Sequence, residues 1–414
     1  MHRSIPSILA LFLTATVAHA ATYYVALTGS DSNPCTEAAP CQTIPKGVSM
    51  LASGDTLYLR GGTYPAINLG TSGVNPPSGT SWDTATTIAA YPGERPILPS
   101  SGISFSANEQ YIIFDGLTMP TGGLALYAPA AHIRFQNGEI DGEGWPGGYM
   151  LIVGSGRDLQ IVNSDLHGSG GNHGAGCTDA YGCYAMYWAG SDSLFDRNRV
   201  YDNGSYGFHI YDTGSRTVSN NVVRNSIFYN NGHYDPRNQI HCGMVISHGT
   251  NNQVYNNVLY NNGCGIQVSG GCVNCLVYNN TLYNNNRSFG ISVAPASRAI
   301  IRNNIVIGSG TNDYEDYDGA STRDHNWATA DGNPLFVNAG ANDFHLREGS
   351  PAIDAGIPVT LPGSSAPLPY VGAAPDLGAY EFGGQTGPDT SGTPPALPPP
   401  PVLPSPVLPQ QTPP

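Results

Sequence analysis

The segments that decide the fold are short, and they repeat along the middle of the chain. Residues 222–232 read VVRNSIFYNNG, residues 253–263 read QVYNNVLYNNG, residues 276–286 read LVYNNTLYNNN and residues 300–308 read IIRNNIVIG. Each segment joins a few alternating apolar residues to a turn of asparagine or glycine, which is the pattern of a short β-strand. Weaker copies surround residues 135–142, 161–168 and 195–204.

A second set of short strands lies between these segments, and each of them starts at a glycine. The strands begin at Gly207, Gly243, Gly265 and Gly290, so the later ones are 22 and 25 residues apart. A period of about 20 to 30 residues with several tiny strands per repeat indicates a β-solenoid. Strands this short bury a core only when coils stack about 4.8 Å apart and pair above and below.

Asparagine recurs at one position of the repeat. Asn198, Asn257, Asn280 and Asn304 are equivalent, with Ser164 and Ser226 as variants in other coils. Asparagine tolerates turn geometry and bonds its neighbours. We therefore expect stacked side chains that pass hydrogen bonds from coil to coil, a structural role.

The chain divides into five parts. We expect a signal peptide over residues 1–20, because a basic start and an apolar stretch end in Ala18-His-Ala20. The others are an N-terminal cap with the first coils (21–100), β-helix repeats (101–332), a C-terminal cap (333–382) and a disordered Pro-rich tail (383–414).

Composition indicates a secreted protein and limits its partners. The eight cysteines suit an oxidising compartment; Cys35 and Cys41 are expected to close a loop, and the CxxC at Cys272 and Cys275 is interpreted as structural rather than redox or zinc-binding. The net charge is −14 and Lys46 is the one lysine, so the chain lacks the basic stripe that binds nucleic acid or anionic membranes. No later stretch is apolar enough to span a membrane, and we expect a monomer.

The repeats and their flanking blocks resemble the secreted right-handed parallel β-helix superfamily of pectate lyases, alginate lyases, polygalacturonases and mannuronan C5-epimerases. The flanking blocks are TYYV at residues 22–25 with CQTI at 41–44, and SPAIDAG at 350–356 with APDLGAY at 374–380. The resemblance covers roughly residues 21–382. It implies an all-β, single-stranded solenoid and a polysaccharide partner, but not one reaction, because this fold hosts many.

The chain departs from the catalytic patterns of that superfamily. Many β-helix lyases use a lysine or arginine base beside calcium-binding aspartates, yet Lys46 lies in the N-terminal cap. The nearest catalytic echo is YGFHIYD at residues 206–212, which resembles the epimerase pattern YGFDPHD. His209 stands in place of the aspartate there, and Tyr211 in place of the histidine.

Strand alternation points His209 and Tyr211 outward, because Phe208 and Ile210 should face the core. Register then places Tyr187, His209, Val245, Gln267 and Ser292 in one outward row. Ala189, Tyr211, Ser247 and Ser269 form the next row.

Insertions at residues 171–183 and 233–241 interrupt the period beside these rows, and insertions of this kind often form the binding face. A single outward histidine is usually a plain surface residue. We nevertheless favour a site here, because several catalytic residue types converge: His209, Tyr211, His233, Asp235, Arg237 and His241.

A lyase or epimerase on a uronate polymer needs a base, a proton donor and a group that neutralises the substrate carboxylate. We assign these roles to His209, Tyr211 and Arg237 in turn. The expected substrate contacts are Tyr187, His241, Gln267, His248 and Asp235.

Three alternatives stay open beside a lyase acting on an acidic polysaccharide. One is a C5-epimerase, the second is a hydrolase with paired carboxylates from Asp212, Asp235 and Asp179, and the third is a solenoid that only binds carbohydrate. No metal site is assigned. Calcium remains open as a cofactor, although the acidic segment 313–318 reads better as a solvated loop.

Overall fold

The structure is a computed structural model that describes residues 20–70, 73–143, 150–172, 175–177, 182–212, 218–233, 239–362, 364–384 and 387–388. Several predictions fall outside these ranges: nearly all of the expected signal peptide and Pro-rich tail, and parts of both insertions. No helix in the described ranges has the length and apolar character needed to cross a membrane.

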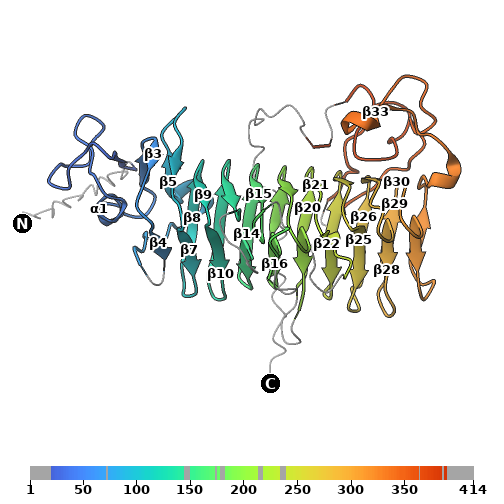
Figure 1. Cartoon of the computed structure of the whole chain (residues 1–414), viewed down its shortest axis with the longest axis horizontal. Helices are drawn as coiled ribbons and strands as arrows, with labels where there is room; N and C mark the ends of the chain where they lie inside the picture. The colour runs from blue at the N-terminus through green and yellow to red at the C-terminus, as the bar shows by residue number, and fades with distance from the viewer. Residues whose placement is uncertain are drawn as a thin grey trace, which may run out of the picture.

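Three long parallel sheets run the length of the molecule and form a right-handed β-helix, as the repeats predict (Figure 1). Sheet A contains β1 (Thr22–Val25), β2 (Thr56–Leu59), β5 (Thr86–Ala90), β8 (Gln110–Asp115), β11 (Ala131–Gln136), β14 (Arg157–Val162), β17 (Leu194–Asp196), β20 (Val222–Arg224), β23 (Gln253–Tyr255), β26 (Cys275–Tyr278), β29 (Ala299–Arg302) and β32 (Thr322–Asp324). Sheet B contains β3 (Gly62–Thr63), β6 (Pro96–Ile97), β9 (Thr118–Pro120), β12 (Glu139–Asp141), β15 (Asp165–His167), β18 (Arg199–Tyr201), β21 (Ile227–Tyr229), β24 (Val258–Tyr260), β27 (Thr281–Tyr283) and β30 (Ile305–Ile307). Sheet C contains β4 (Asn68–Gly70), β7 (Gly102–Phe105), β10 (Gly123–Leu126), β13 (Ile152–Gly154), β16 (Met186–Trp188), β19 (Phe208–Ile210), β22 (Cys242–Ser247), β25 (Cys264–Ser269), β28 (Ile291–Val293) and β31 (Tyr314–Asp316).

The core is a column of apolar side chains enclosed by the three sheets. Each short strand turns its alternate residues inward, as Phe208 and Ile210 of β19 show with at most 1% exposure. Successive coils approach closely at the first residues of the strands of sheet C, as at Gly265 of β25. A Cβ atom added at Gly265 would lie 2.1 Å from the carbonyl oxygen of Gly290, so glycine is required there.

The asparagine ladder is confirmed between sheets A and B. The Oδ1 of Asn280 accepts the backbone N–H of Asn257, and the Oδ1 of Asn304 accepts that of Asn280, both at 3.0 Å. Ser164 and Ser226 continue the ladder toward the N-terminus. The ladder residue itself is not the left-handed one; the residue just before it is, as at Asn256 (φ 54°).

The residues with left-handed backbone at this turn form a second column, which we call the left-handed column. Its members come from successive coils and have φ between 47° and 58°: Asn137, Asn163, Arg197, Asn225, Asn256, Asn279, Asn303 and His325. Asparagine suits this conformation because its short polar side chain bonds locally. Arg197, within the row of coils, and His325, in the last coil, are therefore the two exceptions to asparagine in the column.

Described segments on both sides of the coil repeats cover the solenoid. At the N-terminus, helix α1 (Ile44–Ser49) adds Ile44 and Val48 to the core, and the Cys35–Cys41 disulfide forms as expected. The described segment of 333–382, expected as a cap, packs against the outer faces of sheets A and B near the last coils. Its antiparallel pair β33 (Phe336–Asn338) and β34 (Asp343–Leu346) brings Phe344 within 5.1 Å of the ring of Tyr283.

Three short 3-10 helices complete the described elements. They are η1 (Trp82–Thr84), η2 (Thr329–Asp331) and η3 (Ala339–Ala341).

Candidate functional site

The outward row expected on sheet C is present with the expected register. Tyr187 of β16 pairs with His209 of β19, and His209 pairs with Val245 of β22. Val245 pairs with Gln267 of β25, which in turn pairs with Ser292 of β28. His209 and Gln267 are partly exposed, whereas Val245 and Ser292 are buried. Strand pairing alone thus sets the spacing of this row.

His209 lies at the centre of a cluster of aromatic rings. Its imidazole is 5.3 Å from the ring of Tyr187 and 5.3 Å from the ring of Tyr211, measured between centroids. The Tyr211 ring is 5.5 Å from that of His248. The structure therefore brings together the proposed base, the proposed acid and two of the expected substrate contacts.

Two tyrosines that the sequence analysis missed complete the cluster. The Tyr206 ring is 4.8 Å from His209 and 4.4 Å from His241, so it connects the two histidines. The Tyr184 ring is 5.8 Å from His209. A spacing signal was available, because each of these tyrosines stands three residues before an outward residue of the row.

We call these seven residues the His/Tyr cluster: Tyr184, Tyr187, Tyr206, His209, Tyr211, His241 and His248.

Strand β22 fixes the positions of two histidines of the cluster. His241 precedes the strand and is 3% exposed, whereas His248 follows it in a left-handed turn with φ 68°. The disulfide between Cys242 and Cys264 ties the start of β22 to β25. Histidine rings held at both ends of one short strand give the cluster a preformed shape.

Burial sets the protonation state of His209. Burial, the largest cause, and the nearby His241 and His248 together lower the pKa of its imidazole to about 3. The Nδ1 atom is buried and has no hydrogen-bond partner in the described part of the chain. His209 is therefore neutral near pH 7 and has a lone pair available to accept a proton.

Two predicted site residues, Arg237 and Asp235, lie outside the described residues, as does Asp179 of the alternative carboxylate set. His233 is described, and its Nε2 lies 2.6 Å from the backbone oxygen of Asn261. Its side chain thus contacts the turn between sheets B and C.

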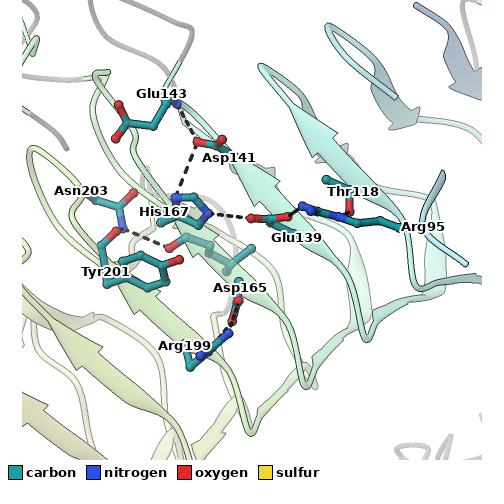
Figure 2. A network of polar contacts seen from close by, with 11 residues as sticks. Arg95, Thr118, Glu139, Asp141, Glu143, Asp165, His167, Arg199, Tyr201 and Asn203 are labelled. Carbon is teal, nitrogen blue, oxygen red and sulfur yellow. Dashed lines mark hydrogen bonds and ion pairs between the residues drawn. The ribbon is translucent and has the colours of Figure 1, made fainter. Parts of the chain in front are cut away.

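A separate polar network occupies the outer face of sheet B (Figure 2). The His167 Nε2 lies 3.2 Å from Glu139, and its Nδ1 lies 3.6 Å from Asp141. Arg95 pairs with Glu139, and Arg199 donates from Nε to Asp165 at 2.7 Å.

Carboxylates dominate the charge around His167. Burial alone would lower the pKa of His167, but the hydrogen bond to Glu139 and the charges of Asp141, Glu139 and Asp165 raise it. Glu139, Asp141 and Asp165 each lie beside a basic side chain. We therefore interpret the network as a set of links between coils rather than as a free acid–base pair.

The described residues contain no group of three or more His, Cys, Asp or Glu side chains placed to hold a metal ion. In the acidic segment 313–318, the Asp318 side chain accepts the backbone N–H of Ala296, and that of Asp313 accepts the N–H of Thr329. These bonds join loops 22 and 16 residues apart in the chain, a structural role.

Three stacked parallel sheets with an outward row of His, Tyr and Gln define the class of the molecule as a right-handed β-helix protein. The family model for the Pel9A-like right-handed β-helix region matches residues 23–304, which is more than half of the chain. The chain belongs to this Pel9A-like family. A search of curated proteins gives no match to its sequence.

Solved structures share the fold at low sequence identity. The pectate lyase Pel9A superposes with a TM-score of 0.64 and 20% identity, over 87% of this chain and 96% of that one. A rhamnogalacturonan lyase gives 0.53 and 17%, over 76% and 90%. The GH136 lacto-N-biosidase of Eubacterium ramulus gives 0.50 and 12%, over 73% and 67%. At these identities the likeness shows the fold alone, so the reaction has to be argued from the site.

Proposed function

We propose that this protein is a secreted lyase that cleaves a uronate-containing polysaccharide by β-elimination. The observation that carries the proposal is the placement of His209 and Tyr211 on one outward face of sheet C, with ring centroids 5.3 Å apart. A neutral imidazole beside a phenol is a base and an acid within reach of one sugar ring.

The reaction begins with removal of the proton on C5 of the uronate, which the free lone pair of His209 accepts. The electron pair of the broken C5–H bond forms the C4–C5 double bond, and the bond from C4 to the glycosidic oxygen breaks. Tyr211 donates its phenolic proton to that leaving oxygen. The products are an unsaturated uronate end and a new hydroxyl end, and the C5 proton remains on His209.

The substrate carboxylate has to be neutralised for its neighbouring proton to become acidic. We assign this to Arg237. An anionic sugar beside His209 also raises the pKa of that imidazole from its low value, because an opposite charge favours the protonated form. Substrate binding thus strengthens the base at the moment it is needed.

The remaining members of the row supply binding. Tyr187 offers a ring on the coil before His209, and Gln267 offers an amide two coils after it. Aromatic rings pack on the apolar faces of sugars, and amides bond their hydroxyls. We keep Asp235 as a substrate contact on the adjoining loop.

Four disulfides use all eight cysteines of the chain, in keeping with an oxidising compartment. This supports the proposal of secretion, which rests on the apolar N-terminal segment.

Epimerisation at C5 is the second candidate. It begins with the same proton removal, but a proton then returns to the opposite face of the sugar. The ring centroids of Tyr187 and Tyr211 each lie 5.3 Å from that of His209, and the centroid of Tyr206 lies 4.8 Å from it. The site therefore has more than one phenol for that step.

A panel of pectate, alginate and glycosaminoglycan polymers tests the proposal. β-Elimination produces absorbance at about 235 nm, because the product contains a new conjugated double bond. His209→Ala should lower the rate at which this absorbance appears by about 10²-fold to 10⁴-fold, the range for loss of a general base. His345→Ala, which removes an exposed histidine of the C-terminal segment, should leave the rate unchanged.

Each alternative has its own product. Unchanged chain length with altered sugar composition would favour the epimerase, and reducing ends without the absorbance would favour a hydrolase. Binding without any product would leave a carbohydrate-binding solenoid. Full activity in His209→Ala would remove the base assignment.

A further inference from the structure

Arg197 breaks the pattern of the left-handed column. Asn137, Asn163 and Asn225 occupy the neighbouring positions, and Arg197 adopts the same backbone with φ 58°. A long side chain gains nothing from this conformation, because it lacks the short amide that bonds locally. The turn conformation therefore does not explain why arginine occupies this position.

The amide relay along the column stops at this residue. Asn137 donates to Asp115 at 2.7 Å, and Asn163 donates to Asn137 at 2.7 Å. On the far side, Asn225 donates to Asp196 at 2.9 Å instead of continuing the column.

The guanidinium of Arg197 is buried without adequate partners. Its side chain is 12% exposed, and its Nε has no hydrogen-bond partner in the described part of the chain. The carboxylate of Asp196 lies 3.7 Å away, beyond hydrogen-bond length, and already accepts bonds from Arg224 and Asn225. A cation so placed is electrostatically unsatisfied.

Arg197 lines a groove of about 430 Å³ on the flank of the solenoid. The turn between sheets A and B supplies Asn163 and Asn225, sheet B supplies Arg199 and Tyr229, and the C-terminal segment supplies Asn342. Arg199 is already paired with Asp165 (Figure 2). The surplus positive charge in the groove therefore comes from Arg197, in a chain whose net charge is −14.

We infer that this groove is a second saccharide-binding site, separate from the His/Tyr cluster, and that it takes a carboxylate-bearing sugar unit. The carboxylate pairs with the planar guanidinium of Arg197, which presents parallel donors to two oxygens. The amides of Asn163, Asn225 and Asn342 serve the sugar hydroxyls. The volume suits a small ligand.

The groove is not part of the reaction. It lies between sheets A and B and the C-terminal segment, whereas the His/Tyr cluster lies on sheet C. It would hold a second stretch of an acidic polymer while sheet C acts on the first. The choice of a hexuronate as the ligand rests on the proposed function. The observation that the Arg197 guanidinium lacks adequate partners is independent of that function.

Calorimetric titration with trigalacturonate and trimannuronate tests this inference on the full chain. His209→Ala serves as the background so that no turnover occurs. We expect binding at the groove with at least one trimer, and about tenfold weaker binding there in Arg197→Asn, because the charge-assisted hydrogen bond to the carboxylate is lost. The methyl esters of both trimers should lose the same component.

Arg197→Asn is a suitable variant because it installs the residue that neighbouring coils already carry, so we expect the fold to be kept. Arg323→Asn removes an exposed arginine of β32 at the last coil and is the matched control for charge; its binding should not change.

The two proposals fail separately in this experiment. Two components in the His209→Ala background, one of which is lost in Arg197→Asn, support both binding sites. A single component lost in Arg197→Asn supports the groove and not sheet C. Binding that is the same in Arg197→Asn, or absent with both trimers, overturns the inference.

Discussion

His209 shows how position sets the chemistry of one side chain. The sequence predicts an outward histidine beside Tyr187 and Tyr211, and the structure adds the ring of Tyr206 and the burial that lowers its pKa. Burial and like charges keep its imidazole neutral. A neutral histidine that binds an anionic substrate is a base whose strength depends on whether the site is occupied.

The low pKa of His209 predicts how stability depends on pH. The imidazole has an ordinary pKa of 6.5 in the unfolded chain and about 3 in the folded chain. Between these values the unfolded state binds the extra proton, so acid favours unfolding. Above about pH 7 both states are neutral, and the histidine adds no pH dependence.

Urea unfolding of the wild type and His209→Gln from pH 8 to pH 4 measures this effect. We expect a constant difference in unfolding free energy above pH 7. Below pH 6.5 the wild type should lose stability more steeply than the variant. Parallel curves over the whole range would show that His209 is not held neutral by the fold.

The asparagine ladder is the element-scale device that joins the coils. Asn280 is fully buried; its Nδ2 donates to Val254 and Asn304 at 3.0 Å, and its Oδ1 accepts from Asn257. Asn280→Ala leaves several buried backbone and amide groups unsatisfied, at about 1–3 kcal/mol each. We expect the free energy of unfolding to fall by about 3 kcal/mol.

Denaturant titration followed by circular dichroism checks this loss. Asn286→Ala is the control, because the exposed Asn286 donates to Asn284 alone among the described residues, and its removal should change stability by less than about 0.5 kcal/mol. Equal effects in the two variants would mean that the ladder does not stabilise the coils.

Local patterns predicted the elements well because the alternation and the turn residues of each coil lie within a single repeat. Alternation placed Phe208 inside and His209 outside, and counting from glycine to glycine gave the register from Tyr187 to Gln267. The ladder positions followed from the same counting. These features depend on residues within one coil and on the fixed stacking of the next.

Contacts across longer distances were not predictable in the same way. The links from Arg95 to Glu139 and from Glu139 to His167 join residues more than 25 positions apart, and the repeat pattern does not say which side chains pair between coils. The groove at Arg197 also needs Asn342 from the C-terminal segment. Periodicity within coils carries no information about how that segment packs on the flank.

At the scale of the whole molecule, the solenoid separates its faces. Sheet C presents the His/Tyr cluster. Sheet B presents an ion-pair network (Figure 2), and the C-terminal segment covers later coils of sheets A and B (Figure 1). Coils about 4.8 Å apart offer a regular track for a polymer with a similar repeat. The polymer that we propose as substrate would therefore lie along sheet C.

The crystal structure of the His209→Ala variant with a bound hexagalacturonate or hexamannuronate would test the central claim most directly. We expect a sugar chain along the outer face of sheet C, with one unit over the rings of Tyr187 and Tyr211 and its C5 facing the position that the imidazole of residue 209 has left. Saccharide bound elsewhere on the molecule, with sheet C empty, would contradict it.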